Sequence, residues 1–164
     1  PVARATFYNL GARRHSTTKI AVRWRSELDD RLIPGMVPHL VFCAGVVDMA
    51  APGGGQPADP EQAAVQMDKL LAEAAVVAST LVISPPPVTD AVASARIGQL
   101  GKLQQQLCAR QGIAFAQVYE LLANTTDYMN DLSDGLHPGS QGCDRMAQTL
   151  LAQECVRAFM CAAQ

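Results

Sequence analysis

The chain has 164 residues, of which 49% are hydrophobic and 17% are charged, and its formal net charge is −2. This length predicts a single domain over residues 1–164 with a buried core, and the composition excludes a disordered chain. The small net charge, with Lys and Arg scattered along the sequence, provides no basic surface for nucleic acid or for an anionic membrane, so neither partner is expected.

Cysteine usage and hydropathy exclude several further classes of protein. The five cysteines form no Cys-x-x-Cys pair, which indicates free, mostly buried thiols rather than a zinc site. No apolar run reaches the roughly 20 residues of a membrane-spanning helix. No signal-peptide pattern opens the chain, so a cytoplasmic protein is expected, although Pro1 need not be the native first residue.

The first part of the chain alternates apolar runs with an amphipathic segment. Residues 5–10 (ATFYNL) stop at Gly11 and predict a strand that ends in a turn. Ser16 is a good N-cap, and apolar residues recur every four positions over 16–32, which predicts an amphipathic helix. The near-continuous apolar run at 39–44 then predicts a strand of a parallel sheet covered on both faces.

Strands and helices continue to alternate after a glycine-rich loop at residues 51–57. The expected elements are a helix at about 60–78, a strand at 80–84, a helix at about 90–110, a strand at 113–116, a short helical segment within 118–131 and a helix from 140 to about 161. Alternation with crossover helices of a dozen or more residues predicts a parallel sheet with helices on both faces.

The sequence Asp134-Gly135-Leu136-His137-Pro138 is the strongest candidate for a catalytic site. A carboxylate three residues before a histidine can orient one imidazole nitrogen and leave the other free to move a proton. The alternative is a polar turn before a helix. The turn lies after the last predicted strand, and ligands of parallel sheets bind beyond the carboxyl ends of the strands.

Three short motifs in this chain resemble the blocks of the SGNH (GDSL-type) ester hydrolases. Residues 8–11 (YNLG) resemble the second block, residues 45–48 (GVVD) resemble the third block, Gly-x-Asn-Asp, and residues 134–138 (DGLHP) resemble the fifth block, Asp-x-x-His. The motifs occur in the order and spacing of that family and cover nearly the whole chain.

This resemblance implies a flavodoxin-like three-layer α/β/α fold with a parallel sheet, and hydrolysis of carboxylic esters, thioesters or acyl groups on small molecules, lipids or sugars. In that family His137 would be the general base and Asp134 would hold its imidazole. The backbone N–H of Gly11 would donate to the oxyanion, although Gly11 can equally be a turn glycine at a strand end. No metal or organic cofactor is needed.

The chain departs from the family pattern at two places. The first block, a central strand followed by Gly-Asp-Ser, should precede Tyr8 by a few dozen residues, so the first strand and the nucleophile are missing from this chain. The serines present are poor substitutes: Ser16, Ser84, Ser133 and Ser140. Val47 stands where the third block has an asparagine that donates to the oxyanion, and losing one such donor costs on the order of 10²–10³ in kcat.

Three hypotheses follow. The first is an ester hydrolase with a Ser-His-Asp mechanism whose serine lies upstream of this chain. The second is a catalytically impaired binding or interaction module. The third is a complete chain that pairs with a partner or as a homo-oligomer to fill the missing strand position.

The remaining polar and aromatic residues have simpler interpretations. Arg13 lies on the predicted rim and could meet an anionic group of the substrate, and Val47 would line the same site. Asp48 is expected to brace a loop. His15 and His39 are expected at the surface or at a strand start, and two apolar residues, Trp24 and Met67, in the core.

Overall fold

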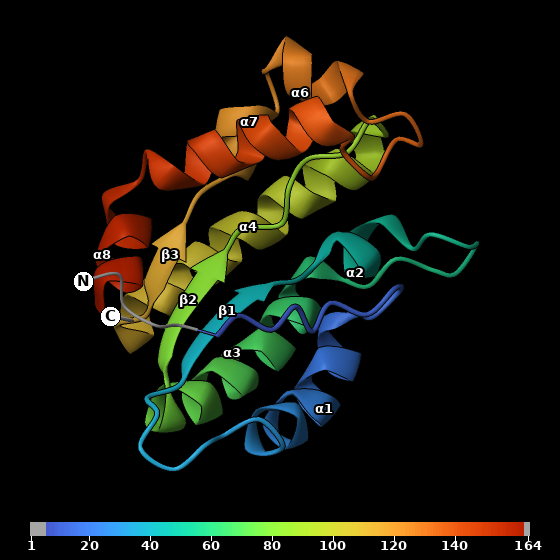
Figure 1. Cartoon of the computed structure of the whole chain (residues 1–164). Coiled ribbons are helices and arrows are strands. Elements are labelled where there is room, and N and C mark those ends of the chain that lie inside the picture. Colours follow the sequence, from blue (N-terminus) through green and yellow to red (C-terminus); the bar gives the residue numbers. More distant parts are fainter. Residues whose placement is uncertain (1–5, 163–164) are drawn as a thin grey trace.

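Three parallel strands form the centre of the structure, a computed structural model that describes residues 6–162 (Figure 1). They are β1 (His39–Cys43), β2 (Ser79–Ile83) and β3 (Ala114–Ala116), and they lie side by side in the order β1-β2-β3. Both strand pairs are parallel, and each strand is connected to the next by a crossover that contains a helix. The predicted parallel sheet is confirmed.

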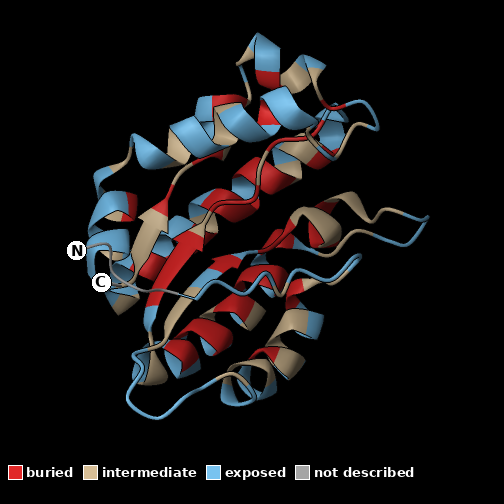
Figure 2. Ribbon diagram, in the orientation of Figure 1, coloured by how far each residue is buried: buried red, intermediate tan, exposed pale blue. Residues whose placement is uncertain are grey.

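One helical layer covers a full face of this sheet. It consists of α1 (Thr17–Asp29), α3 (Pro60–Val77) and α4 (Ala91–Gln111), with α3 packed between the other two. The main core lies between this layer and the strands, where Figure 2 shows a continuous band of buried residues. Trp24 and Met67 are both buried there, as expected from their positions on apolar helix faces.

Local capping residues fix the helix boundaries, among them the predicted N-cap Ser16. The Ser16 side chain accepts a hydrogen bond from the backbone N–H of Lys19 at the start of α1. Asp59 caps α3 in the same way, and the left-handed backbone of Gly112, with φ of 68°, ends α4. These signals are local, which is why the sequence alone located them.

The second helical layer covers only part of the opposite face. It is formed by α5 (Tyr119–Leu122), α6 (Thr126–Asn130), α7 (Ser140–Leu151) and α8 (Glu154–Ala162). Val156 of α8 packs on Leu81 and Ala116 of the sheet, so this layer lies over β2 and β3. The structure is therefore a three-layer α/β/α sandwich with one thinner layer.

The single helix predicted from Ser140 to about residue 161 is wrong, because it is broken between α7 and α8. The side chain of Gln153, at the break, accepts a hydrogen bond from the backbone N–H of Gln117 at 2.8 Å and donates to its carbonyl oxygen at 2.8 Å. Gln153 thereby ties the break to the end of β3 and turns α8 onto the sheet. An apolar periodicity does not show such a long-range contact.

Two other expectations about secondary structure need correction. Residues 6–10 form no strand; they run alongside β1 (Figure 1), and Ala5 lies outside the described residues. Residues 46–50 form a short helix, α2 (Val46–Ala50), instead of a loop. Gly45, with φ of 128°, permits the sharp turn from β1 into α2.

The thiols are free, but they are not mostly buried. Cys43, Cys143 and Cys161 are exposed, Cys155 is half-buried, and only Cys108 is fully buried. No helix over residues 6–162 is long and apolar enough to span a membrane.

Candidate active site

Asp134 and His137 face each other in the loop between α6 and α7. One oxygen of the Asp134 carboxylate accepts hydrogen bonds from the backbone N–H groups of Leu136 at 2.9 Å and His137 at 2.7 Å. The other oxygen lies 2.7 Å from Nδ1 of the His137 imidazole. The spacing of three residues therefore closes a tight turn that brings both predicted groups together.

The hydrogen bonds in this turn fix the charge of Asp134. The backbone N–H of His137, its imidazole and the backbone N–H of Leu136 hold the pKa of the Asp134 carboxyl well below its usual value of 3.8. Asp134 is therefore a carboxylate at any ordinary pH. Since it occupies Nδ1 of His137, the nitrogen left to exchange a proton with another group is Nε2.

The free edge of β1 opens into a groove of about 1830 Å³ that reaches the His137 loop. Its walls come from residues 6–15, from α1 and its following loop, and from all five residues of β1. The start of α2, the end of α8 and the loops that carry Pro85 and His137 complete them. The volume is about twice the upper end of the usual range for small-molecule sites, roughly 300–1,000 Å³. A small ester alone would leave much of this groove empty.

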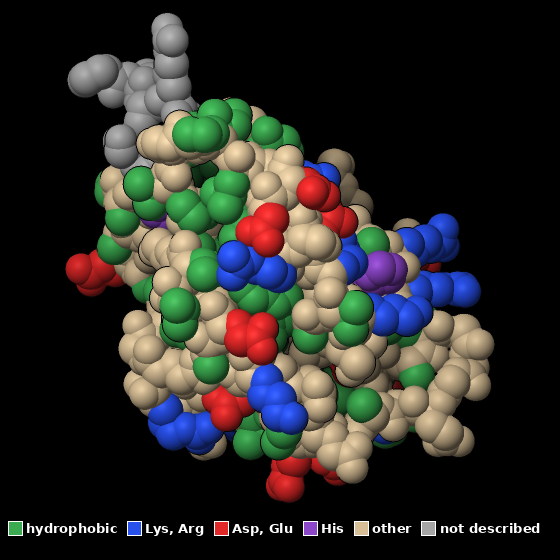
Figure 3. Space-filling model, turned by 90° about the horizontal axis from the view of Figure 1, so that it is seen from below, with side chains coloured by type: hydrophobic (Ala, Val, Ile, Leu, Met, Phe, Trp, Pro, Cys, Tyr) green, Lys and Arg blue, Asp and Glu red, His purple; other side chains and the backbone are tan. Residues whose placement is uncertain are grey.

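Apolar side chains are exposed around the groove. Phe7 is 84% exposed, Val37 77% and Val41, in the middle of β1, 52%. In Figure 3, which views the molecule from the side of α1, apolar side chains lie uncovered among the polar ones. Exposed apolar side chains beside an unpaired strand edge favour a protein segment, rather than water, as the occupant of this position.

The other predicted site residues all lie on the wall of this groove. Gly11 is exposed, and its backbone N–H donates to the side-chain oxygen of Asn9 at 3.0 Å, so its role as an oxyanion donor stays a prediction. Val47 lies in the first turn of α2 and offers no donor. Arg13 is exposed at the rim.

Asp48 has the structural role that was expected of it, although toward another element. Its buried carboxylate accepts hydrogen bonds from the backbone N–H of Thr17 at 3.0 Å and from the Thr17 hydroxyl at 2.9 Å. The carboxylate therefore braces the start of α1, and the backbone carbonyl of Asp48 accepts from the N–H of Ala58 at 2.8 Å, at the far end of the following loop. His39 begins β1, and its ring packs edge-on against Phe159 at 5.3 Å.

None of the hydrogen bonds of residues 6–162 joins a hydroxyl group to the His137 imidazole. Ser84 is fully buried, donates to the side chain of Gln117 at 2.9 Å and accepts from the backbone N–H of Val118 at 2.8 Å. Ser16 is occupied as a helix cap. Among the described residues, no hydroxyl group is therefore hydrogen-bonded to the imidazole.

Two residues that support the His137 loop are not evident from the sequence. Thr89 donates its backbone N–H to the carbonyl oxygen of Gly135 at 3.0 Å, and Asp131 accepts from the backbone N–H of Gly142. Gly135 has φ of 80°, and a Cβ there would lie 2.6 Å from the Thr89 hydroxyl, so only glycine fits. Both contacts join residues far apart in the sequence, and no local pattern marks them.

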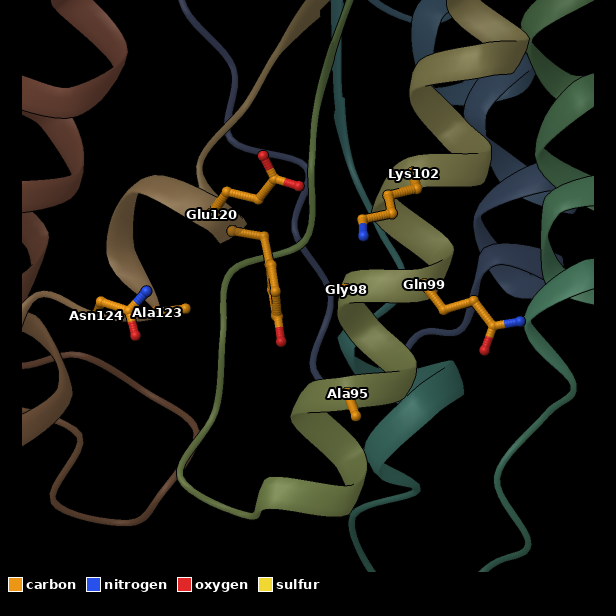
Figure 4. Close-up of a pocket in the computed structure, with 8 residues that line it drawn as sticks. Ala95, Gly98, Gln99, Lys102, Glu120, Ala123 and Asn124 are labelled. Carbon is orange, nitrogen blue, oxygen red and sulfur yellow. The ribbon is translucent and has the colours of Figure 1, made fainter.

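A second, smaller cavity of about 460 Å³ lies between α4 and α5 (Figure 4). Gly98 leaves room there for the Tyr119 ring, which would lie 2.7 Å from a Cβ at that position. Lys102 and Glu120 reach its mouth, and it shares no lining residue with the groove. No group of three potential metal-binding side chains occurs among the residues that the structure describes.

Comparison with known proteins agrees with the fold. A model of the GDSL-like lipase/acylhydrolase family matches residues 2–145. LAE5, an alpha/beta hydrolase enzyme from the metagenome of Lake Arreo in Spain, superposes with a TM-score of 0.69 at 17% identity, covering 89% of this chain and 70% of that one. No curated protein sequence matches the chain.

Two further structures have the same fold. Axe2, an acetylxylan esterase from Geobacillus stearothermophilus, gives a TM-score of 0.68 at 13% identity over 85% of this chain and 67% of that one. A lipolytic protein of the G-D-S-L family from Veillonella parvula gives 0.69 at 12% identity over 85% and 75%. At such identities the likeness concerns the fold, whereas the family match spans most of the sequence; the chain therefore belongs to the GDSL-like lipase/acylhydrolase family.

Proposed function

We propose that this protein hydrolyses small-molecule or lipid esters by a Ser-His-Asp mechanism, with His137 as general base and Asp134 as its orienting acid. The nucleophile is a serine in sequence that precedes Pro1, carried on a strand that occupies the groove beside β1. The observation that carries this proposal is the Asp134–His137 pair, with Nε2 uncommitted, at the end of an unfilled strand position.

Unpaired backbone on both sides of the groove supports a strand as the missing part. β1 pairs only with β2 among the described strands, so its other edge carries free N–H and C=O groups. Across the groove, residues 6–11 make no backbone–backbone hydrogen bond with any described residue. The Leu10 carbonyl oxygen accepts a hydrogen bond from the Arg23 side chain and the Gly11 N–H donates to Asn9, so a strand in the groove would chiefly pair the free edge of β1.

A strand parallel to β1 would end at the same rim as β1, where the His137 loop lies. A serine just after that end would be adjacent to the imidazole. Its hydroxyl oxygen would attack the ester carbonyl while Nε2 of His137 takes the hydroxyl proton and later returns it to the leaving alcohol. Water would then release the acyl group by the same steps, with Asp134 stabilising the imidazolium.

The reaction also needs hydrogen-bond donors for the oxyanion, and the groove wall offers one candidate. The N–H of Gly11 would turn from Asn9 to the oxyanion, but Val47 adds no second donor from α2. We therefore expect turnover to be lower, on the order of 10²–10³, than with an amide donor at this position. Because acetylxylan esterases share the fold, short acyl esters are the first substrates to assay.

The test uses the full-length protein with its upstream sequence. Hydrolysis of p-nitrophenyl acetate and butyrate is expected, and His137→Ala should lower kcat by about 10⁴ or more. The matched control is Asp127→Asn, because Asp127 is an exposed acid that pairs with Arg145 and does not line the groove. Hydrolysis that survives His137→Ala unchanged would refute the proposal.

A binding module without catalysis is the second candidate, and Val47 is the observation that favours it. A serine-reactive fluorophosphonate probe separates the two functions. Labelling of the full-length protein that disappears in His137→Ala supports the hydrolase, whereas an unlabelled but folded protein supports the binding module.

A further inference from the structure

Helix α7 begins without a capping side chain of its own. Its N-cap residue is Gly139, which has no side chain to accept a hydrogen bond from the first turn. The acceptor comes instead from Asp131, whose carboxylate receives the backbone N–H of Gly142 at 2.6 Å. A residue before the His137 loop therefore caps the helix after it.

The backbone carbonyl of Asp131 also connects the first and last residues of the His137 loop. Its carbonyl oxygen accepts from the backbone N–H of Gly139 at 3.1 Å and from that of Ser133 at 3.1 Å. A Cβ at Gly139 would lie 2.9 Å from the Asp131 carboxylate, and one at Gly142 would lie 3.0 Å from it. The two glycines thus let the carboxylate sit directly against the start of α7.

His137 itself has little else to hold it. Its side chain is 73% exposed, and its one side-chain hydrogen bond is to Asp134 in the same loop. The orientation of the imidazole relative to the rest of the molecule therefore depends on how firmly the loop backbone is fixed. Pro138, next to His137, would lie 2.7 Å from a Cβ at Gly142, so the start of α7 and the imidazole are closely linked.

We propose that Asp131 is a positioning residue for His137: by tying both ends of the loop to the start of α7, it keeps the imidazole against Asp134. The predicted effect of Asp131 on turnover depends on the proposed hydrolase function. Its predicted effect on the orientation of the His137 imidazole does not. Asp131 touches neither substrate nor imidazole. Its negative charge at a helix N-terminus adds to the hydrogen bond.

The competing interpretation is that Asp131 stabilises α7 and nothing more. Asp59 provides the matched control, because it caps α3 by accepting from the backbone N–H groups of Glu61 at 2.8 Å and Gln62 at 3.1 Å. It lies in no contact with the His137 loop and lines neither cavity. Removing either carboxylate should destabilise the protein by a similar amount, but only one should disturb the imidazole.

The experiment records imidazole ¹⁵N spectra of the 164-residue chain in alkaline buffer. His137→Gln assigns the signal, and His15 and His39 serve as internal references. In the unaltered chain the tautomer with the proton on Nδ1 should dominate. In Asp131→Ala the ratio of this tautomer to the other should fall about fivefold, the equivalent of one ordinary hydrogen bond.

Three further variants complete the test. Asp131→Asn keeps an acceptor oxygen and should restore the ratio, Asp59→Ala should leave it unchanged, and Gly142→Ala should lower it by pushing on Pro138. If Asp131→Ala fails to fold, the tautomer ratio of His137 in Gly142→Ala tests the proposal instead. Equal ratios in Asp131→Ala and Asp59→Ala, or no recovery in Asp131→Asn, overturn the proposal.

In the full-length protein, Asp131→Ala should lower kcat roughly tenfold to a hundredfold at unchanged KM, since a small misplacement of a catalytic group has effects of this size. Absence of any hydrolysis in the unaltered full-length protein would count against the proposed hydrolase alone. The tautomer ratio would still decide the role of Asp131.

Discussion

The two halves of the sheet differ in how completely they are covered. At the centre, Thr80, Leu81 and Val82 of β2 are all buried, because α3 and α4 cover one face and α8 the other. In β1 only Phe42 is buried, and its free edge borders the groove. The covered half forms the main core, whereas the open half borders the groove that reaches His137.

The largest expected effect on stability contrasts these halves directly. Leu71 of α3 is fully buried in the main core, so Leu71→Ala should lower the free energy of unfolding by about 2–5 kcal/mol. Val41→Ala in the open half should change it by about 0.5 kcal/mol or less. Urea unfolding of both variants measures the difference, and equal losses would mean that β1 is as well covered as β2.

Hydrogen exchange shows whether the open half closes in the full-length protein. If an upstream strand pairs with the free edge of β1, the outward-facing amides of His39–Cys43 should exchange at least about 10²-fold more slowly than in the 164-residue chain. Amides of β2, already paired on both sides, are the internal control. Equal exchange rates of the β1 amides in the full-length protein and in the 164-residue chain would mean that no upstream strand pairs with β1.

The support of the His137 loop by Thr89 should be visible at Gly135. Gly135→Ala combines a left-handed backbone with a contact of 2.6 Å to the Thr89 hydroxyl, and it should destabilise the protein by about 1–3 kcal/mol. Gly112→Ala is the control, because its φ is also positive but nothing lies within 4 Å. Thermal unfolding should show the larger loss at Gly135, and a reversed order would contradict the contact.

The smallest effect is a pH dependence of the Asp134 turn. The folded-state pKa of Asp134 lies below the usual 3.8, so its ionised form adds stability that is fully present above that value and is lost as the pH falls further. The carboxyl carbon of Asp134, followed by NMR, should stay ionised when the pH is lowered through 3.8. A titration midpoint near 3.8 would mean that the turn is not formed.

Much of the fold was predictable because it depends on short-range signals. Ser16, Asp59 and Gly112 mark helix ends through contacts with their own neighbours, and the apolar runs of β1 and β2 identify buried strands. Errors occurred where a distant group decides the outcome. Gln117 contacts the break in the last helix, and residues 6–10 form no strand because they pair with none of the described strands.

The candidate site divides in the same way. Asp134 and His137 were found from the sequence because they are only three positions apart, so that a single turn can bring them together. The roles of Asp131 and Thr89 were not, because Asp131 caps α7 through Gly142, 11 residues further on, and Thr89 contacts Gly135 from 46 residues away. The oxyanion role of Gly11 stays a prediction, since its N–H is taken up by Asn9.

The three strands of the sheet, the crossover helices between them and the Asp134–His137 pair are determined by the sequence itself, since each depends on periodicity or on residues within one turn. The groove beside β1, its exposed apolar wall and the support of the His137 loop by Asp131 are decided only in the tertiary structure. Each of these requires segments from different parts of the chain to meet, and a contact between distant segments leaves no local pattern in the residues that form it.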